Sequence, residues 1–273
     1  MNSQCNPLLT LGFSPCPNDT FIFDGLVNGP VRIPGYHVRA QLHDVEILNQ
    51  MAFDSLLDVT KLSLFAWLAV QKRYRLLSSG GSLVFGRGPV VIAKTPLTRE
   101  DMASSRIVLP GRWTTAHLLL RLWSPESHQR SFIAYDRIFE AVQSGEADCG
   151  VVIHESRFTY QEAGFHQVVD LGAWWEEQTA LPIALGCIAI HRRHPEDLAR
   201  QVEMAIRRSV RRAQEQPALT LPYIRAYAQE MRPQVLEAHI QTFVNEYSLD
   251  HGDAGRAAIA AMETRARQRG LIP

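Results

Sequence analysis

Four segments of this sequence join a short apolar run to side chains that can bind an anion or move a proton. They are residues 8–20, 57–63, 106–117 and 149–157. Ligands of open α/β folds bind at the carboxyl ends of strands, so polar residues that directly follow a strand-like run are the ones to weigh. The chemistry to consider is recognition of a small anion beside a group that accepts a proton.

His154 is the best candidate for such a base, because it ends the apolar run of residues 149–153. An imidazole has an ordinary pKa of about 6.5, which suits proton transfer at neutral pH. Arg157 follows closely and adds a cation. A lone histidine is more often structural than catalytic, but its place at a strand end facing the expected cleft makes the two interpretations about even, so both stay open.

Residues 14–20 form a polar turn with two prolines between a strand-like run and the apolar residues 21–23. Asp19 or Thr20 is expected to cap a helix here, which leaves the first N–H groups of that helix for an anion. Asn18 and Asp19 are therefore candidate ligand contacts. A simple capped turn explains the same residues, and the residue types favour that interpretation.

A second turn of this kind, residues 110–117, places Thr114 and Thr115 at the expected start of a helix. Capping requires only one of the two threonines. Two adjacent hydroxyls, together with the N–H groups of a first helical turn, would also bind a carboxylate. The sequence therefore predicts a carboxylate site at this turn.

The remaining polar stretch, Lys61, Leu62 and Ser63, closes a strand-like run and precedes an apolar helix. At the carboxyl end of a parallel strand these residues would face a ligand. The alternative is that Lys61 is a solvated charge and Ser63 is a helix cap.

These segments need a framework to position them, and the hydropathy pattern predicts one. Strand-like and helix-like runs alternate through the first two thirds of the chain, and residues 195–273 have a helical pattern. The predicted fold is α/β, with two lobes and a ligand cleft between them. We expect residues 1–89 and 190–273 to form the first lobe and residues 90–189 to form the second.

Composition excludes several classes of protein. The 273 residues contain 28 Lys and Arg and 28 Asp and Glu, so no net field would draw the chain to nucleic acid. No apolar run reaches the roughly 18 residues of a membrane-spanning helix, and the first residues lack the pattern of an export signal. We expect a cytoplasmic protein that does not insert into a membrane.

The four cysteines are far apart in the sequence and form no C-x-x-C pair. No phosphate-binding loop, dinucleotide fingerprint or H-E-x-x-H helix occurs. We therefore expect neither a metal nor a cofactor. No residue pattern indicates an oligomeric state.

Longer segments follow one another in order along most of the chain: GFSPCPNDTFIF (12–23), TKLS (60–63), PGR and TT (110–115), IHESRFTY (153–160) and DLGAWWEE (170–177). Together they resemble the 1,4-dihydroxy-6-naphthoate synthases of the futalosine route to menaquinone. The resemblance implies a type II periplasmic-binding-protein-like fold and a cytoplasmic lyase that needs no cofactor. The implied reaction converts cyclic dehypoxanthinyl futalosine, a carboxylate, to 1,4-dihydroxy-6-naphthoate and releases a three-carbon fragment, dihydroxyacetone.

The same resemblance implies that His154 is the catalytic base. The segments that contact substrate in the family correspond to these residues: Lys61, Leu62, Ser63, Thr114 and Thr115. Trp113 is a departure, because some members of the family have histidine at this position. We expect this difference to change the shape of the site's rim and to leave the roles of the two threonines unchanged.

Two alternatives belong to different functional classes. A solute-binding protein for a small carboxylate would use the same fold, and fold alone does not determine function. The related chorismate dehydratase is the second alternative. The lack of an export signal and the base-like His154 count against the first, while residues 14–20 and 154–157 favour the synthase over the second.

Overall fold

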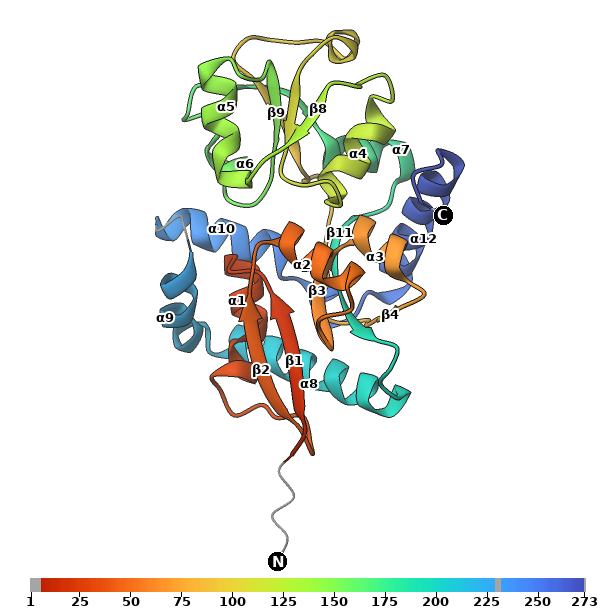
Figure 1. Ribbon diagram of the computed structural model, residues 1–273. Helices are drawn as coiled ribbons and strands as arrows, with labels where there is room; N and C mark the ends of the chain where they lie inside the picture. Colours follow the sequence, from red (N-terminus) through yellow and green to blue (C-terminus); the bar gives the residue numbers. More distant parts are fainter. Residues whose placement is uncertain (1–5, 229–231, 273) are drawn as a thin grey trace, which may run out of the picture. The chain divides into compact units, whose positions relative to one another are not determined.

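The computed structural model describes residues 6–228 and 232–272. The chain forms two compact units, drawn in Figure 1. Unit 1 comprises the described residues of Met1–Leu62, Val70–Ser82 and Gly186–Gly252, and unit 2 those of Ser63–Ala69, Leu83–Leu185 and Asp253–Pro273.

The elements of unit 1 are a sheet and the helices that cover it. The sheet has the order β2-β1-β3-β11-β4, with β5 beside β11. Its strands are β1 (Leu8–Phe13), β2 (His37–Leu42), β3 (Val59–Ser63), β4 (Tyr74–Leu76), β5 (Ser82–Val84) and β11 (Ile183–His191). Its helices are α1 (Pro17–Val27), α2 (Val45–Phe53), α8 (Glu196–Glu215), α9 (Pro217–Tyr227), α10 (Pro233–Phe243) and α11 (Glu246–Leu249).

Unit 2 has its own sheet, in the order β10-β6-β9-β7-β8. Its strands are β6 (Val90–Ala93), β7 (Ile107–Leu109), β8 (Arg130–Phe132), β9 (Cys149–Val152) and β10 (His166–Asp170). Its helices are α3 (Leu64–Val70), η1 (Glu100–Ala103), α4 (Thr115–Trp123), η2 (Tyr135–Arg137), α5 (Ile138–Ser144), α6 (Ser156–Thr159), α7 (Leu171–Thr179) and α12 (Gly252–Gln268).

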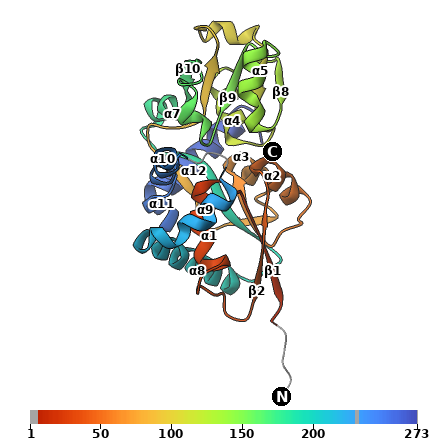
Figure 2. The same ribbon diagram turned by 90° about the vertical axis from the view of Figure 1, so that its left-hand side faces the viewer.

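The core of unit 1 forms because α8 is amphipathic. Leu198, Val202, Ile206 and Val210 recur at helical spacing and are all buried, while arginines occupy the other face. This apolar face packs with α1, and Figure 2 shows α1 among α8, α9 and α10. The helix predicted from the sequence after Pro195 is confirmed.

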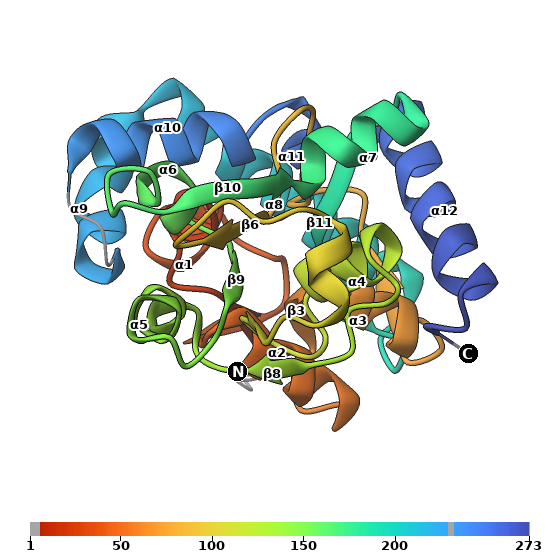
Figure 3. The same cartoon turned by 90° about the horizontal axis from the view of Figure 1, so that it is seen from above.

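Strand direction brings the polar segments to defined edges of the two sheets. In unit 1, β1 runs parallel to β2 and β3. In unit 2, β7 runs parallel to β8 and β9, whereas β6 runs antiparallel to β9 and β10 (Figure 3). The carboxyl ends of neighbouring parallel strands lie at one edge of a sheet. The turns after β1 and β3 therefore share an edge, as do the turns after β7 and β9.

Three elements differ from the sequence-based expectation. The C-terminal helix α12 belongs to unit 2, not to the first lobe, because Arg265 donates to the carbonyl of Gln178 and lies over the ring of Trp175. The short strand β5 was not predicted. The apolar pattern of residues 132–135 predicts a strand, but β8 ends at Phe132 and the chain turns into η2.

A charged cluster around Asp58 joins three segments of unit 1. Its carboxylate accepts hydrogen bonds from Thr10 N and Oγ1, from Arg193 and from His194 Nε2. Burial raises the pKa of Asp58, but these donors outweigh burial and hold it well below the usual range. The ionised carboxylate therefore stabilises the junction of β1, β3 and β11.

We expect this cluster to make the stability of the protein sensitive to acid. Because the folded pKa of Asp58 is depressed, its contribution is complete above the unfolded pKa of about 3.9 and is lost as pH falls below that value. Asp58→Asn should therefore lower the free energy of unfolding at neutral pH and flatten its decline between about pH 5 and 3. Urea titrations across this range would measure the effect, with the exposed Asp54→Asn as the control. Equal acid sensitivity in Asp58→Asn and the wild type would contradict this account.

None of the helices in residues 6–228 and 232–272 has the length and apolar character that crossing a membrane requires.

Candidate active site

Lys61 and Asp19 form a buried ion pair in unit 1. Lys61 lies near the carboxyl end of β3, and Asp19 lies in the first turn of α1, which follows β1. The distance from Lys61 Nζ to Asp19 Oδ1 is 2.6 Å, and the side chains are 7% and 1% exposed. The sequence-based alternative of a solvated lysine is therefore wrong.

A polar network extends from this ion pair to α10. Asn18 donates from its amide nitrogen to Asp19 Oδ1 at 2.9 Å, and its amide oxygen lies 2.9 Å from His239 Nε2. His239 is buried. A carbon at the Cβ position of Gly186 would approach Lys61 Cε to 2.8 Å, so glycine leaves the space through which the lysine side chain runs. Sequence reasoning did not identify His239 or Gly186.

The start of α1 differs from the prediction. The helix begins at Pro17, its N-cap residue is Cys16, and no side chain caps it. Asp19 accepts hydrogen bonds from the backbone N–H and hydroxyl of Ser14 at 3.1 and 2.7 Å. Thr20 donates to the carbonyl of Cys16. Pro17 has no N–H to offer an anion, and the Asp19 carboxylate adds negative charge to this first turn. The ligand contacts expected here stay a prediction.

The start of α4 in unit 2 matches the prediction more closely. Thr114 is the N-cap residue and accepts a hydrogen bond from His117 N at 3.3 Å, while its hydroxyl donates to the carbonyl of Gly111 at 2.9 Å. The first N–H groups of a helix have no acceptor within the helix itself. In α4 they belong to Thr115 and Ala116, and they are suited to bind an anion.

Thr115 uses its hydroxyl to hold two backbone segments. It donates to the carbonyl of Leu185 at 2.6 Å and accepts from Phe65 N at 3.4 Å. The start of α3, directly after Ser63, therefore lies beside the start of α4. The structure brings two predicted ligand-contact segments together within unit 2. In this arrangement the hydroxyl proton of Thr115 is directed to Leu185 rather than to a ligand.

His117 completes the support of this turn. Its Nδ1 lies 2.7 Å from the carbonyl oxygen of Arg112, and its ring packs against Phe65 and Phe132. Burial lowers the pKa of His117 to about 4, and nearby arginine charges act in the same direction. At neutral pH the imidazole is uncharged and donates from Nδ1, which fixes the loop ahead of Thr114.

His154 lies in unit 2, in the turn after β9. Its backbone has a φ of 54°, which is in the left-handed region that few side chains adopt. Its ring meets the ring of Tyr135 edge to face at 4.9 Å. Because β9 pairs with β7 in parallel, His154 and the turn that leads to Thr114 follow adjacent strands at the same edge of the sheet. Backbone strain of this kind is concentrated at functional sites.

Glu155 was not identified from the sequence as a site residue. It is 7% exposed, and its Oε2 is buried with no hydrogen-bond partner among the described residues. A buried carboxylate oxygen in this state is costly. Glu155 therefore places a buried carboxylate oxygen that no described residue binds directly beside His154 in the sequence.

Arg157 holds this turn in place rather than presenting a free cation. Its guanidinium donates to the carbonyl of Gly88 and, at 2.8 Å, to Asp170 Oδ2. Asp170 Oδ1 in turn accepts from the N–H groups of Gly88 and Gly172 at 3.0 and 2.8 Å. Arg157 is also a candidate ligand contact from the sequence, and that role stays a prediction. Its observed contacts link the His154 turn to Gly88 and Asp170.

The structure distributes the predicted site residues over both units. Unit 1 contains Asn18, Asp19, Lys61 and Leu62, and unit 2 contains Ser63, Thr114, Thr115, His154 and Arg157. The side chain of Leu62 is fully buried in the core. The predicted convergence of the two sets at one cleft stays a prediction.

Two cysteines can be set aside as nucleophiles. Burial raises the pKa of Cys149 and of Cys187 to about 12, so both thiols are protonated at neutral pH.

Known proteins resemble this chain over nearly its whole length. A family model described as menaquinone biosynthesis matches residues 9–268. A 1,4-dihydroxy-6-naphthoate synthase of Thermus thermophilus is 48% identical over 263 residues, which cover 96% of this chain and 95% of the relative. The synthase of Streptomyces coelicolor is 40% identical over 274 residues, which cover 97% and 95%.

Solved structures share the fold of this chain. A crystal structure of a protein from Archaeoglobus fulgidus has a TM-score of 0.92 and 33% identity, covering 97% of this chain and 98% of that chain. The alkanesulfonate-binding protein of Xanthomonas axonopodis pv. citri, bound to MOPS, has a TM-score of 0.71 and 13% identity, with 98% and 96% covered. The second likeness confirms the predicted periplasmic-binding-protein-like fold. Because the family model and both synthases span almost the entire chain, it belongs to the menaquinone-biosynthesis family, as the resemblance predicted.

Proposed function

We propose that this protein converts cyclic dehypoxanthinyl futalosine to 1,4-dihydroxy-6-naphthoate, with release of dihydroxyacetone, and that His154 is the base. The observation that carries the proposal is the placement of His154. It stands in a strained turn at the same sheet edge as the start of α4, in a chain 48% identical to a 1,4-dihydroxy-6-naphthoate synthase. The substrate is a small carboxylate, and the enzyme acts in the cytoplasm without nucleic acid or membrane partners.

In the proposed reaction, His154 transfers the proton, and the residues that hold its turn keep it in position. The substrate carries an arene carboxylate and a sugar-derived ring, and a carbon–carbon bond to the departing fragment must break. His154 takes a proton from the substrate, the carbon–carbon bond breaks, and its electron pair is held beside a carbonyl until the imidazolium returns the proton to the departing fragment; formation of the second aromatic ring favours the product. The turn held by Arg157 and Asp170 keeps the imidazole in its reacting position.

The start of α4 is the favoured seat for the substrate carboxylate. The corresponding position on α1 holds Asp19, whose charge would repel an anion unless Lys61 compensates for it. The first turn of α4 offers N–H groups, and no acidic residue occurs in that turn. We propose that Lys61 and Ser63 contact the same substrate, because their segment matches the family's substrate-contact segment.

Thr115 provides a specific test of this seat. Thr115→Val keeps the shape of the side chain but leaves the Leu185 carbonyl without its donor and Phe65 N–H without its acceptor. Leaving these two backbone groups unpaired should shift the segments beside the first N–H groups of α4, so we expect KM to rise about tenfold, which corresponds to about 1.4 kcal/mol of binding free energy. Steady-state kinetics would measure this change, and Thr115→Ser, which retains the hydroxyl, should behave like the wild type. An unchanged KM in Thr115→Val would place the carboxylate elsewhere.

A comparison of substrates separates the proposal from its closest alternative. Purified protein would be incubated in parallel with cyclic dehypoxanthinyl futalosine and with chorismate, and the products would be identified by mass spectrometry. We expect the naphthoate from the first substrate and no dehydration of the second. Dehydration of chorismate would instead assign the chain to the dehydratase.

A further inference from the structure

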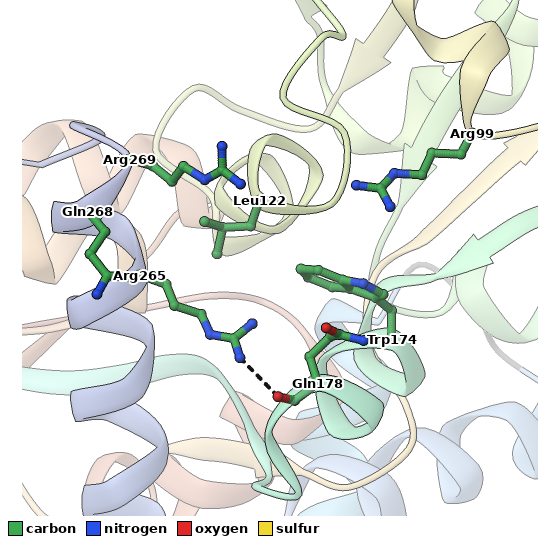
Figure 4. A pocket seen from close by; sticks show the side chains of 7 residues that line it. All are labelled: Arg99, Leu122, Trp174, Gln178, Arg265, Gln268 and Arg269. Atoms are coloured by element: carbon green, nitrogen blue, oxygen red, sulfur yellow. Dashed lines mark hydrogen bonds between the residues drawn. The ribbon is translucent and has the colours of Figure 1, made fainter.

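A basic pocket lies in unit 2, on the side of α4 away from its capped end. Its volume is about 470 Å³, and it is lined by seven residues: Arg99, Leu122, Trp174, Gln178, Arg265, Gln268 and Arg269. All of them belong to unit 2. In Figure 4, Arg99 and Trp174 face Arg265 of α12 and Arg269, which directly follows that helix. This volume falls within the range of about 300–1,000 Å³ that small-molecule sites occupy.

The pocket is distinct from the proposed carboxylate seat. Leu122 is the next-to-last residue of α4, whereas the seat is at Thr115, the first residue of the same helix. Seven residues of α-helix correspond to about 10 Å along the axis. A ligand in the pocket would therefore not occupy the seat.

The arginines of this pocket carry positive charge that the protein does not neutralise. Among the residues that the structure describes, no carboxylate forms an ion pair with Arg99, Arg265 or Arg269. Arg267, on the same helix, differs because it pairs with Glu263 at 2.8 Å. The lining of the pocket also contains no acidic residue. Three cations without counter-charge favour an anion in the space between them.

Tryptophan rings, rather than carboxylates, hold two of these arginines. The guanidinium carbon of Arg265 lies 5.1 Å from the ring centroid of the buried Trp175, and that of Arg99 lies 5.8 Å from the ring of Trp123. Arg265 also donates to the carbonyl of Gln178 at 2.9 Å. Cation–π contacts leave most guanidinium N–H groups available as donors. These arginines are therefore positioned for a planar anionic group such as a carboxylate.

The apolar surface of the pocket indicates that the ligand has a flat ring as well as a negative charge. Trp174 and Leu122 line it, and Trp174 is only partly buried by the protein. An aromatic face of this kind stacks with a flat ring. We infer that this pocket is a second binding site of the protein and that it takes a planar aromatic carboxylate.

Binding in this pocket can be followed by NMR in protein that contains isotope-labelled tryptophan. The indole N–H resonance of Trp174, assigned with Trp174→Phe, would be followed by NMR during titration with 2-naphthoate. We expect a saturable shift that weakens at least tenfold in Arg99→Gln/Arg269→Gln and is unchanged in the control Arg267→Gln. Both arginines of the double variant are exposed, so it should fold. No shift in the wild type, or equal binding by the double variant, would overturn the inference.

Two further probes test the aromatic and the anionic requirements separately. 2-Naphthol has the ring without the charge, and inorganic phosphate has charge without a ring. Each should bind at least tenfold more weakly than 2-naphthoate, and binding of either one with equal affinity would overturn the assigned ligand class.

Binding in this pocket can be tested separately from the proposed reaction. Thr115→Val should leave the Trp174 titration unchanged, while the double arginine variant should keep wild-type turnover. Loss of the Trp174 response in Thr115→Val alone would mean that the response reports on the carboxylate seat, which would also overturn the inference.

Discussion

His154→Asn should abolish most turnover while leaving substrate binding intact. Removal of a general base typically lowers the rate by roughly 10²–10⁴-fold. Asparagine is a suitable replacement because it is polar and tolerates the left-handed backbone that His154 adopts, so the turn after β9 should keep its shape. The measurements are kcat, and the thermal stabilisation that saturating substrate produces in the inactive variant.

The control for this variant is His166→Asn, which removes an exposed histidine from β10 of the same unit. It should retain wild-type kcat. Near-normal turnover in His154→Asn would reject His154 as the base. Loss of both turnover and stabilisation by substrate would show that His154 is required for binding and not for proton transfer alone.

Lys61→Met should have the second large effect, on both stability and activity. The change leaves the buried carboxylate of Asp19 without its cation, although Ser14 and Asn18 still donate to it. Removing one member of a buried ion pair typically costs about 3–5 kcal/mol of unfolding free energy. Urea denaturation would measure this loss, and the exposed Lys72→Met should cost far less.

A double variant separates the two roles of Lys61. Asp19→Asn in the Lys61→Met background removes the unpaired charge and should recover a large part of the lost stability. If Lys61 contacts the substrate, activity should remain low in the double variant even though its stability has recovered. Recovery of activity together with stability would make Lys61 a purely structural residue.

Local pattern accounts for the parts of the site that could be predicted. The apolar residues 8–13 predict a strand and the apolar residues 64–70 predict a helix, and β1 and α3 have these bounds. Thr114 was one of the two expected caps of α4, and His154 was expected directly after a buried strand. Each of these features depends on residues that are close in the sequence.

Long-range contacts account for what could not be predicted. His239 meets Asn18 across 221 positions, and Arg157 reaches Gly88 across 69. The path of Lys61 depends on the absence of a side chain at Gly186. Long-range contacts also explain why α12 was expected in the first lobe. The sequence of an amphipathic helix does not specify which surface will cover its apolar face.

We expect this protein to cleave its substrate and not merely to bind it. The most direct measurement is incubation of the wild-type protein with a large molar excess of cyclic dehypoxanthinyl futalosine, followed by quantification of 1,4-dihydroxy-6-naphthoate and dihydroxyacetone by mass spectrometry. We expect the two products in equal amounts and in many-fold excess over the enzyme. Substrate that stabilises the protein thermally but is recovered unchanged would contradict the account and identify a binding protein.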